Sequence, residues 1–235
     1  MKHTLLLLMA MIMLSGCDNK KADFAPQMKN YAYLYQFEAI PGKVKSTHQR
    51  LFSADNTPIF DVDITCDAQG CIYHVKSIDK AGEITEVTRK GDQLTGSENG
   101  QDVVVTLNKQ CALIKKVTPT MTVDIGYNVQ GWVDQISSPA SDVKFHLTYD
   151  NAGDMTLLSI KKGDEEVSRA SAKHDADAKK ISDVVTTVER NDQSKTVTTQ
   201  CQYKNDVPFR CDTVTTDAEG QVTDKQYGTI EVTYY

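Results

Sequence analysis

Residues 14–17, Leu-Ser-Gly-Cys, place a thiol directly after two small residues at the end of an apolar run. A thiol can take a diacylglycerol as a thioether, and small residues in front of it give a membrane-embedded peptidase access to the peptide bond. The apolar run itself, residues 5–14, is only half as long as the ~20 residues that a helix needs to cross a bilayer core. We therefore interpret residues 1–16 as a signal peptide that is removed, and Cys17 as the lipidated first residue of the mature chain.

The residue after this cysteine could act as a sorting signal. Asp18 occupies the position at which an aspartate retains many lipid-modified proteins in the inner membrane of Gram-negative bacteria. We therefore expect an inner (cell) membrane protein that faces the periplasm; the alternative for Asp18 is a solvated tether residue. Residues 17–30 are predicted to be the lipidated cysteine and a short tether, and residues 31–235 a single periplasmic domain.

The remaining cysteines could form disulfides in an oxidising compartment. Cys201 and Cys211 lie equally far from residue 206, within a stretch whose Asn, Asp and Pro favour a turn. Folding that stretch into a hairpin brings the two residues opposite each other, so we predict a cross-strand disulfide between them.

The other three cysteines allow more than one pairing. Cys66 and Cys71 flank a predicted turn and could form a local bridge, whereas a longer bridge would join Cys71 to Cys111. Loop-closure entropy favours the longer bridge as a staple but does not decide which one forms.

Catalytic signals are weak. The sequence contains no G-x-S-x-G, H-E-x-x-H or C-x-x-C motif and no phosphate-binding glycine loop. Asp61 and Asp63 share one face of a predicted strand, and residues 174–177 offer three potential ligands, but exposed charge explains both patterns. We expect no catalytic residue, metal or cofactor. A carboxylate enzyme would gain support only if folding gathered Asp61 and Asp63 with His74 and His146 in one cleft.

Alternating apolar residues predict the elements that carry these groups. Tyr31, Tyr33, Tyr35 and Phe37 alternate with other residues, which predicts a strand with four rings on one face. Such a face usually packs in a core, and the functional alternative is a groove for an apolar chain or peptide. The other alternating runs are residues 60–64, 103–107, 143–147, 184–188, 197–203 and 230–234.

Turn signals connect these strands. Asp and Gly recur three residues apart, a pattern typical of type I hairpin loops, at residues 67–70, 79–82, 150–153 and 217–220. We therefore predict an all-β fold: one domain of antiparallel meandering strands, as a twisted sheet or an open barrel, with little helix. Residues 168–180, rich in Ala and Lys, form either a helix or a polar loop.

The net charge of the chain argues against two kinds of partner. The chain has 26 Lys and Arg against 32 Asp and Glu, for a net charge of −6. This balance argues against a nucleic-acid surface and against binding of the folded body to anionic headgroups. The membrane contact is expected to be the N-terminal lipid.

A set of short motifs resembles one known family. They are the lipobox, Phe24-Ala25-Pro26-Gln27-Met28, Gly70-Cys71, Gln110-Cys111, Tyr149-Asp150 with Gly153, Cys201-Gln202-Tyr203 with Pro208 and Cys211, and Tyr234-Tyr235. Together they resemble the YnfC family of bacterial lipoproteins over almost the whole length. The resemblance implies a lipid anchor at the cell membrane, no assigned activity, disulfides 71–111 and 201–211, and Cys66 as a free thiol.

These observations favour binding over catalysis. We expect a lipid-anchored binding or structural module on the periplasmic side of the inner membrane, with an envelope protein as a possible partner. The alternative is a carrier or sensor of an apolar ligand behind the face of residues 31–37. An enzyme is the less favoured third class.

Overall fold

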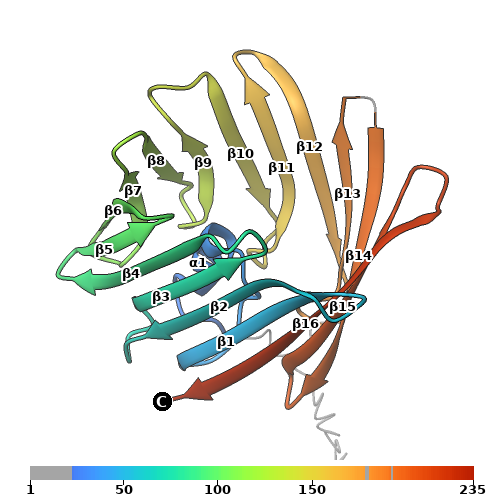
Figure 1. Ribbon diagram of the computed structural model, residues 1–235, viewed down its shortest axis with the longest axis horizontal. Helices are drawn as coiled ribbons and strands as arrows, with labels where there is room; N and C mark the ends of the chain where they lie inside the picture. The colour runs from blue at the N-terminus through green and yellow to red at the C-terminus, as the bar shows by residue number, and fades with distance from the viewer. Residues whose placement is uncertain (1–22, 178–179, 192) are drawn as a thin grey trace, which may run out of the picture.

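The computed structural model describes residues 23–177, 180–191 and 193–235. Within these residues the chain forms one helix followed by sixteen strands in a closed antiparallel barrel (Figure 1). The predicted signal peptide, Cys17 and Asp18 lie outside the described residues.

The elements follow one another along the chain with short connections. Their bounds are α1 Met28–Tyr35, β1 Val44–Ser53, β2 Pro58–Cys66, β3 Ile72–Asp79, β4 Ile84–Lys90, β5 Gln93–Glu98, β6 Gln101–Leu107, β7 Leu113–Val117, β8 Thr122–Tyr127, β9 Val133–Ser137, β10 Val143–Tyr149, β11 Met155–Lys162, β12 Glu165–His174, β13 Val184–Arg190, β14 Gln193–Lys204, β15 Val207–Thr216 and β16 Val222–Tyr234.

Every strand pairs with the next one, which confirms the predicted antiparallel meander and all-β class. The last strand returns to the first: β16 pairs with β1 in a register that runs from Val44 opposite Tyr234 to Ser53 opposite Gln226. The barrel is therefore closed rather than open. Closure leaves no row of unpaired backbone groups at a sheet edge.

The four predicted Asp-x-x-Gly turns are confirmed. In each one the glycine N–H donates to the aspartate carbonyl at 2.9–3.1 Å. The aspartate side chain supports the turn as well; Asp79 Oδ1, for example, accepts the amides of Ala81 and Glu83 at 2.8 and 2.9 Å. The same geometry recurs with asparagine at residues 108–111 and 128–131, where the sequence signal was weaker.

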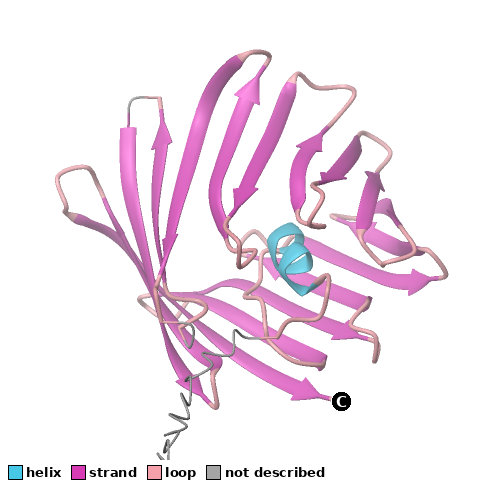
Figure 2. Cartoon of the chain, turned by 180° about the vertical axis from the view of Figure 1, so that it is seen from behind, coloured by secondary structure: helices cyan, strands magenta, loops and turns pink. Residues whose placement is uncertain are grey.

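Alternation along the strands separates a dry lumen from a charged exterior. Inward-facing Val62 and Ile64 on β2 are each 1% exposed, whereas Asp61 and Asp63, which alternate with them, face outward. The valines at 103 and 105 on β6 repeat the pattern. The apolar core is therefore the inside of the barrel, and α1 lies within it (Figure 2).

The expected strand at residues 31–37 is wrong. This segment lies in α1 and in the turn after it, where Gln36 adopts φ 57° and ends the helix. Residues 28, 31, 32 and 35 recur at helical spacing, and the first three are buried. Since positions 31 and 35 satisfy both a period of two and a period of 3.6, the aromatic run alone could not distinguish strand from helix.

Two other expectations need correction. Residues 24–30 are not a free tether, because Met28 and Asn30 are 0% and 2% exposed inside the barrel. Residues 168–174 form neither helix nor loop but belong to β12, which pairs with β11 and β13. Strand pairing on both sides outweighs the helix preference of Ala and Lys there.

The disulfides join Cys71 to Cys111 and Cys201 to Cys211. Cys201 lies directly opposite Cys211 in the β14–β15 register, as the hairpin geometry predicted. Cys66 is free and 3% exposed. This arrangement is the one that the family resemblance implied.

Two glycines offer a matched test of turn packing. Gly153 (φ +77°) and Gly220 (φ +80°) occupy the same position in Asp-x-x-Gly turns, but a Cβ on Gly153 would lie 2.2 Å from Trp132 Cζ2, whereas nothing lies within 4 Å of one on Gly220. We expect Gly220→Ala to lower the free energy of unfolding by about 1 kcal/mol through backbone strain, and Gly153→Ala by about 3 kcal/mol because Trp132 must also move. Urea denaturation measures both, and equal losses would contradict the role of Trp132.

The free thiol offers a second test. Burial raises the pKa of Cys66 to about 12, with the neighbouring Asp67 adding to the shift. Since the thiolate is the reactive form, we expect a disulfide reagent at pH 8 to modify the native protein at least about 100-fold more slowly than the protein in guanidinium chloride. Rapid labelling of the native chain would show that this side chain is accessible.

Candidate binding site in the barrel lumen

The helix α1 closes one end of the barrel by binding three loops. The Tyr31 hydroxyl donates to the Cys111 carbonyl in the β6–β7 loop at 2.6 Å. Asn30 Nδ2 donates to the Gly131 carbonyl in the β8–β9 loop at 2.9 Å, and Lys29 Nζ lies 2.5 Å from Asp154 in the β10–β11 turn. In an up-and-down barrel these three loops lie at the same end, which we call the plugged end.

A disulfide and an ion pair fix the loops to which the helix binds. Cys71 and Cys111 join the β2–β3 and β6–β7 loops. Arg89 Nη2 lies 2.6 Å from Asp67 Oδ2, with both side chains about three-quarters buried. Burial opposes ionisation of Asp67, but Arg89, through its hydrogen bond and charge, together with the amides of Cys71 and Gln69 outweighs it and holds the pKa of that carboxyl below its usual range. The disulfide and the ion pair therefore hold the loops of the plugged end together.

A cavity of about 420 Å³ lies inside the barrel beside the C-terminal half of α1. Its rim contains residues from the β3–β4 and β5–β6 turns, which lie at the end opposite the plugged end. This volume falls within the usual range for small-molecule sites, roughly 300–1,000 Å³. The apolar side chains in its wall are Leu34, Phe60, Val87, Val103, Val105, Leu113, Val123, Ile125 and Ile136.

The other half of the lining is polar or charged: Tyr35, Gln36, Ser77, Asp79, Glu83, Thr85, Glu98, Asn99 and Lys116. Lys116 Nζ lies 2.5 Å from Glu98 Oε2, and each side chain is about 30% exposed. Tyr35 borders the same cavity; burial raises the pKa of its hydroxyl, and the Glu98 carboxylate adds to the shift. The hydroxyl therefore stays protonated and can donate a hydrogen bond.

The rim carries an excess of negative charge. Glu83 Oε2 accepts a hydrogen bond from Asn99 Nδ2 at 2.8 Å, and Asp79 supports its own turn. Together with Glu98, these are three carboxylates against the single ammonium of Lys116. The mouth therefore favours a neutral or cationic polar group over an anionic one.

A second polar cluster holds the segment that follows α1. Burial raises the pKa of Glu38, while the Ser182 hydroxyl and the nearby His174 partly offset the shift. Beside them, Asp183 Oδ1 accepts hydrogen bonds from the Tyr203 hydroxyl at 2.8 Å and from the Cys201 amide at 2.9 Å. Glu38 thus joins the segment after α1 to the β12–β13 loop, and Asp183 joins that loop to β14.

The predicted aromatic face does not form an open groove. Tyr31 is 0% exposed, Phe37 is 9% exposed, and the Tyr33 hydroxyl donates to Met155 Sδ. Of the four aromatic residues, only Tyr35 lines the 420 Å³ cavity. A cavity does lie beside this segment, while the hypothesis that it takes an apolar ligand stays a prediction.

Most residues of this cavity were not predicted from the sequence. The alternation of Val103 with Val105 did predict a dry strand face, and Val123 with Ile125 carried the same unused signal. No sequence signal linked Glu98 to Lys116, because they meet only when the strands pair.

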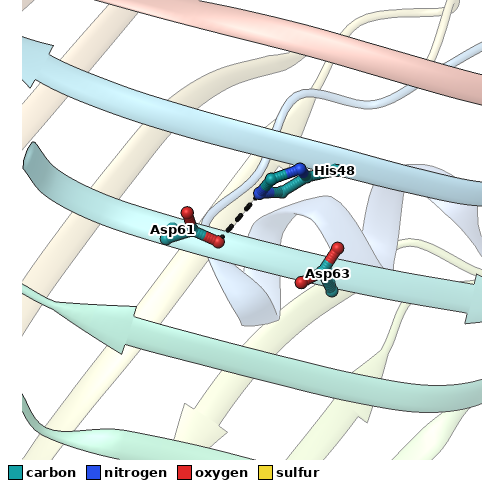
Figure 3. Close-up of side chains that lie close together, drawn as sticks. All are labelled: His48, Asp61 and Asp63. Carbon is teal, nitrogen blue, oxygen red and sulfur yellow. Dashed lines mark hydrogen bonds and ion pairs between the residues drawn. The ribbon is translucent and has the colours of Figure 1, made fainter.

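The residues proposed for a diffuse enzyme site do not gather in one cleft. Asp61 and Asp63 lie on the outer face of β2 beside His48 (Figure 3). His74 on β3 instead approaches Glu86 at 3.4 Å, and His146 lies on β10. The potential ligands at residues 174–177 are not all available either, since His174 Nε2 is hydrogen-bonded to the Met155 carbonyl at 3.0 Å.

Among the helices of the described ranges, none is both long and apolar enough to cross a membrane.

The geometry defines a class: a closed β-barrel with a charged exterior, an internal helical plug and an apolar lumen. The chain belongs to UPF0257, an uncharacterised protein family, which matches residues 1–235. It is 27% identical over 210 residues to the UPF0257 lipoprotein YnfC of Salmonella dublin, covering 86% of this chain and 85% of that protein. The YnfC of Escherichia coli O81 is 23% identical over 221 residues, covering 92% of each.

The barrel fold is also found among solved structures. A porin-like protein from Bacteroides uniformis aligns with a TM-score of 0.58 at 12% identity, covering 81% of this chain and 98% of that one. At this identity the similarity concerns the barrel architecture alone.

The buried carboxyl at residue 38 predicts a pH dependence of stability. Because the folded-state pKa of Glu38 is raised, its contribution to stability is complete below the unfolded value of about 4.3 and is lost as pH rises through the folded value. Glu38→Gln should therefore match the parent protein near pH 4 and become progressively more stable than the parent towards pH 8. Thermal unfolding across this range measures the difference, and a difference independent of pH would contradict burial of the carboxylate.

Proposed function

We propose that the protein is a lipid-anchored binding module of the cell envelope whose barrel lumen takes the apolar part of a neutral or cationic amphiphile. The observation that carries this proposal is the cavity of about 420 Å³, whose lining combines a set of apolar side chains with polar and charged ones that include the rim of the barrel. The proposal favours a carrier or sensor of an apolar ligand over a purely structural module and over an enzyme.

The cavity suits such a ligand on energetic grounds. Transfer of apolar surface from water contributes roughly 25 cal/mol per Å² buried, and a wall made by rigid strands is already ordered before the ligand arrives. The Glu98–Lys116 pair and the Tyr35 hydroxyl supply donors and acceptors at one side of this wall. A molecule with an apolar tail and an uncharged or positive head matches both parts.

The position at which the described chain begins, beside the start of β1, supports one orientation of the barrel relative to the membrane. The Asp23 carbonyl accepts the Gly42 amide at 2.6 Å, and Gly42 lies just before β1 at the plugged end. Six residues connect a lipid on Cys17 to Asp23, a reach of at most about 20 Å. We infer that the plugged end faces the bilayer and that the mouth faces the periplasm.

The charged side chains on the exterior support the proposal that the barrel lies in water. Charged side chains face outward on neighbouring strands: Arg50 on β1, Asp61 on β2, Lys76 on β3, Glu86 on β4 and Glu231 on β16. On a lipid-facing barrel surface a basic residue at the membrane midplane costs about 2–4 kcal/mol. Attachment through Cys17, with Asp18 directing retention at the inner membrane, is consistent with this surface.

Native mass spectrometry of the lipidated chain, purified from membranes in a nonionic detergent, tests the proposal. The parent protein should carry a bound amphiphile that differs from the detergent. Val123→Trp fills the lumen and should reduce the bound fraction at least about fivefold, because the tail loses its space. The matched control is Val104→Trp on the outer face of β6, which should leave the bound fraction unchanged. Equal occupancy in the parent and in Val123→Trp would refute lumen binding.

A further inference from the structure

The outer face of the barrel brings together three side chains that can ligate a metal. His48 on β1 lies directly opposite Asp63 on β2 in the strand register, with Asp61 two residues away on the same face (Figure 3). One potential ligand atom from each residue lies within 4.8 Å of the other two. His48 Nε2 and Asp61 Oδ1 are already only 3.0 Å apart.

The cationic residues around this cluster are committed elsewhere. Arg50 is the cross-strand partner of Asp61, yet its guanidinium pairs with Glu231 at 3.0 Å. Lys76 is the cross-strand partner of Asp63, yet its ammonium lies 3.7 Å from Glu86.

Among the residues that the structure describes, the two aspartates therefore have no lysine or arginine partner. Within the described ranges, Asp63 makes no side-chain hydrogen bond or ion pair, and Asp61 makes one, to His48. Two carboxylates on one strand face repel each other, and a bound cation would relieve that repulsion.

We propose that His48, Asp61 and Asp63 form a binding site for a divalent transition-metal ion of the zinc type. One imidazole nitrogen and two carboxylate oxygens form a zinc donor set, with bonds of about 2.0–2.2 Å and a fourth position left for water or an external ligand. Tetrahedral bonds of that length place ligand atoms about 3.3 Å apart. The His48–Asp61 pair nearly has that spacing, and rotation of the exposed Asp63 side chain supplies the rest.

This site is independent of the lumen. It lies on the opposite surface of β2 from the inward-facing Val62 and Ile64, so either site can exist without the other. The sequence showed Asp61 and Asp63 on one strand face, but His48 comes from a different strand. For that reason the expectation of no metal site did not take His48 into account.

Calorimetric titration of the full chain, stripped with chelator in nonionic detergent, with Zn²⁺ alone tests the site. The parent should bind one equivalent. Asp63→Asn keeps the shape of a side chain that makes no hydrogen bond or ion pair in the described ranges, and should weaken zinc binding at least about tenfold without lowering the thermal unfolding midpoint. His48→Ala should weaken binding by at least as much.

His74→Ala is the matched control, because His74 also lies on the barrel exterior and pairs with a carboxylate, Glu86, but is not one of the three residues whose ligand atoms come together. Zinc affinity in this variant should stay within about twofold of the parent. Absence of a one-to-one zinc site, or unchanged affinity in both His48→Ala and Asp63→Asn, would overturn the proposal. So would calcium binding as tight as zinc binding and indifferent to His48→Ala, since that result would define a different class of site.

Discussion

The structure depends on the filling of a wide lumen by the helix α1. A barrel of sixteen strands encloses more space than inward side chains alone can fill, and barrels of about this size are otherwise open channels. Here Met28, Tyr31 and Ile40, from the helix and the segment after it, are each 0% exposed. They supply the second surface against which the inward faces of the strands pack. The apolar core therefore consists of a strand layer and a plug that the same chain contributes before its first strand.

The plug is held by polar groups as well as by packing. Asn30 accepts the Val133 amide at 3.1 Å through Oδ1 while Nδ2 donates to the Gly131 carbonyl, so one buried side chain satisfies two backbone groups of the β8–β9 connection. Buried groups left without such partners cost about 1–3 kcal/mol each. This constraint fixes the helix at one end of the lumen. The cavity beside it is thus a consequence of where the polar contacts hold the plug.

The sequence predicted the strands and turns well because both have local causes. Alternation with a period of two identifies a strand with one dry face, as at Val103 and Val105, and Asp with Gly three residues later identifies a hairpin loop. The pairing of Cys201 with Cys211 followed from the same local geometry. Cys71 with Cys111 did not, because its loops are joined only by the barrel; there the resemblance to a family supplied what the spacing left open.

The errors have a common physical origin in tertiary contacts. Four aromatic residues within seven positions fit a strand as well as a short helix, and only the shape of the lumen selects the helix. Residues 168–174 became a strand because β11 and β13 offer backbone partners on both sides. The candidate sites followed the same rule: Glu98 on β5 approaches Lys116 on β7 across β6, and His48 lies opposite Asp63, in registers that the sequence did not specify.

The barrel also shows why shared architecture leaves function open. The similarity to a porin-like protein concerns the closed barrel of strands, whereas the behaviour of a barrel in lipid or water depends on which face of each strand is apolar. In this chain the apolar residues at 62 and 64 point inward and the aspartates at 61 and 63 point outward. A shift by one residue in the alternation would exchange the two faces. The alternation on this strand therefore places apolar side chains in the lumen and carboxylates on the outer wall.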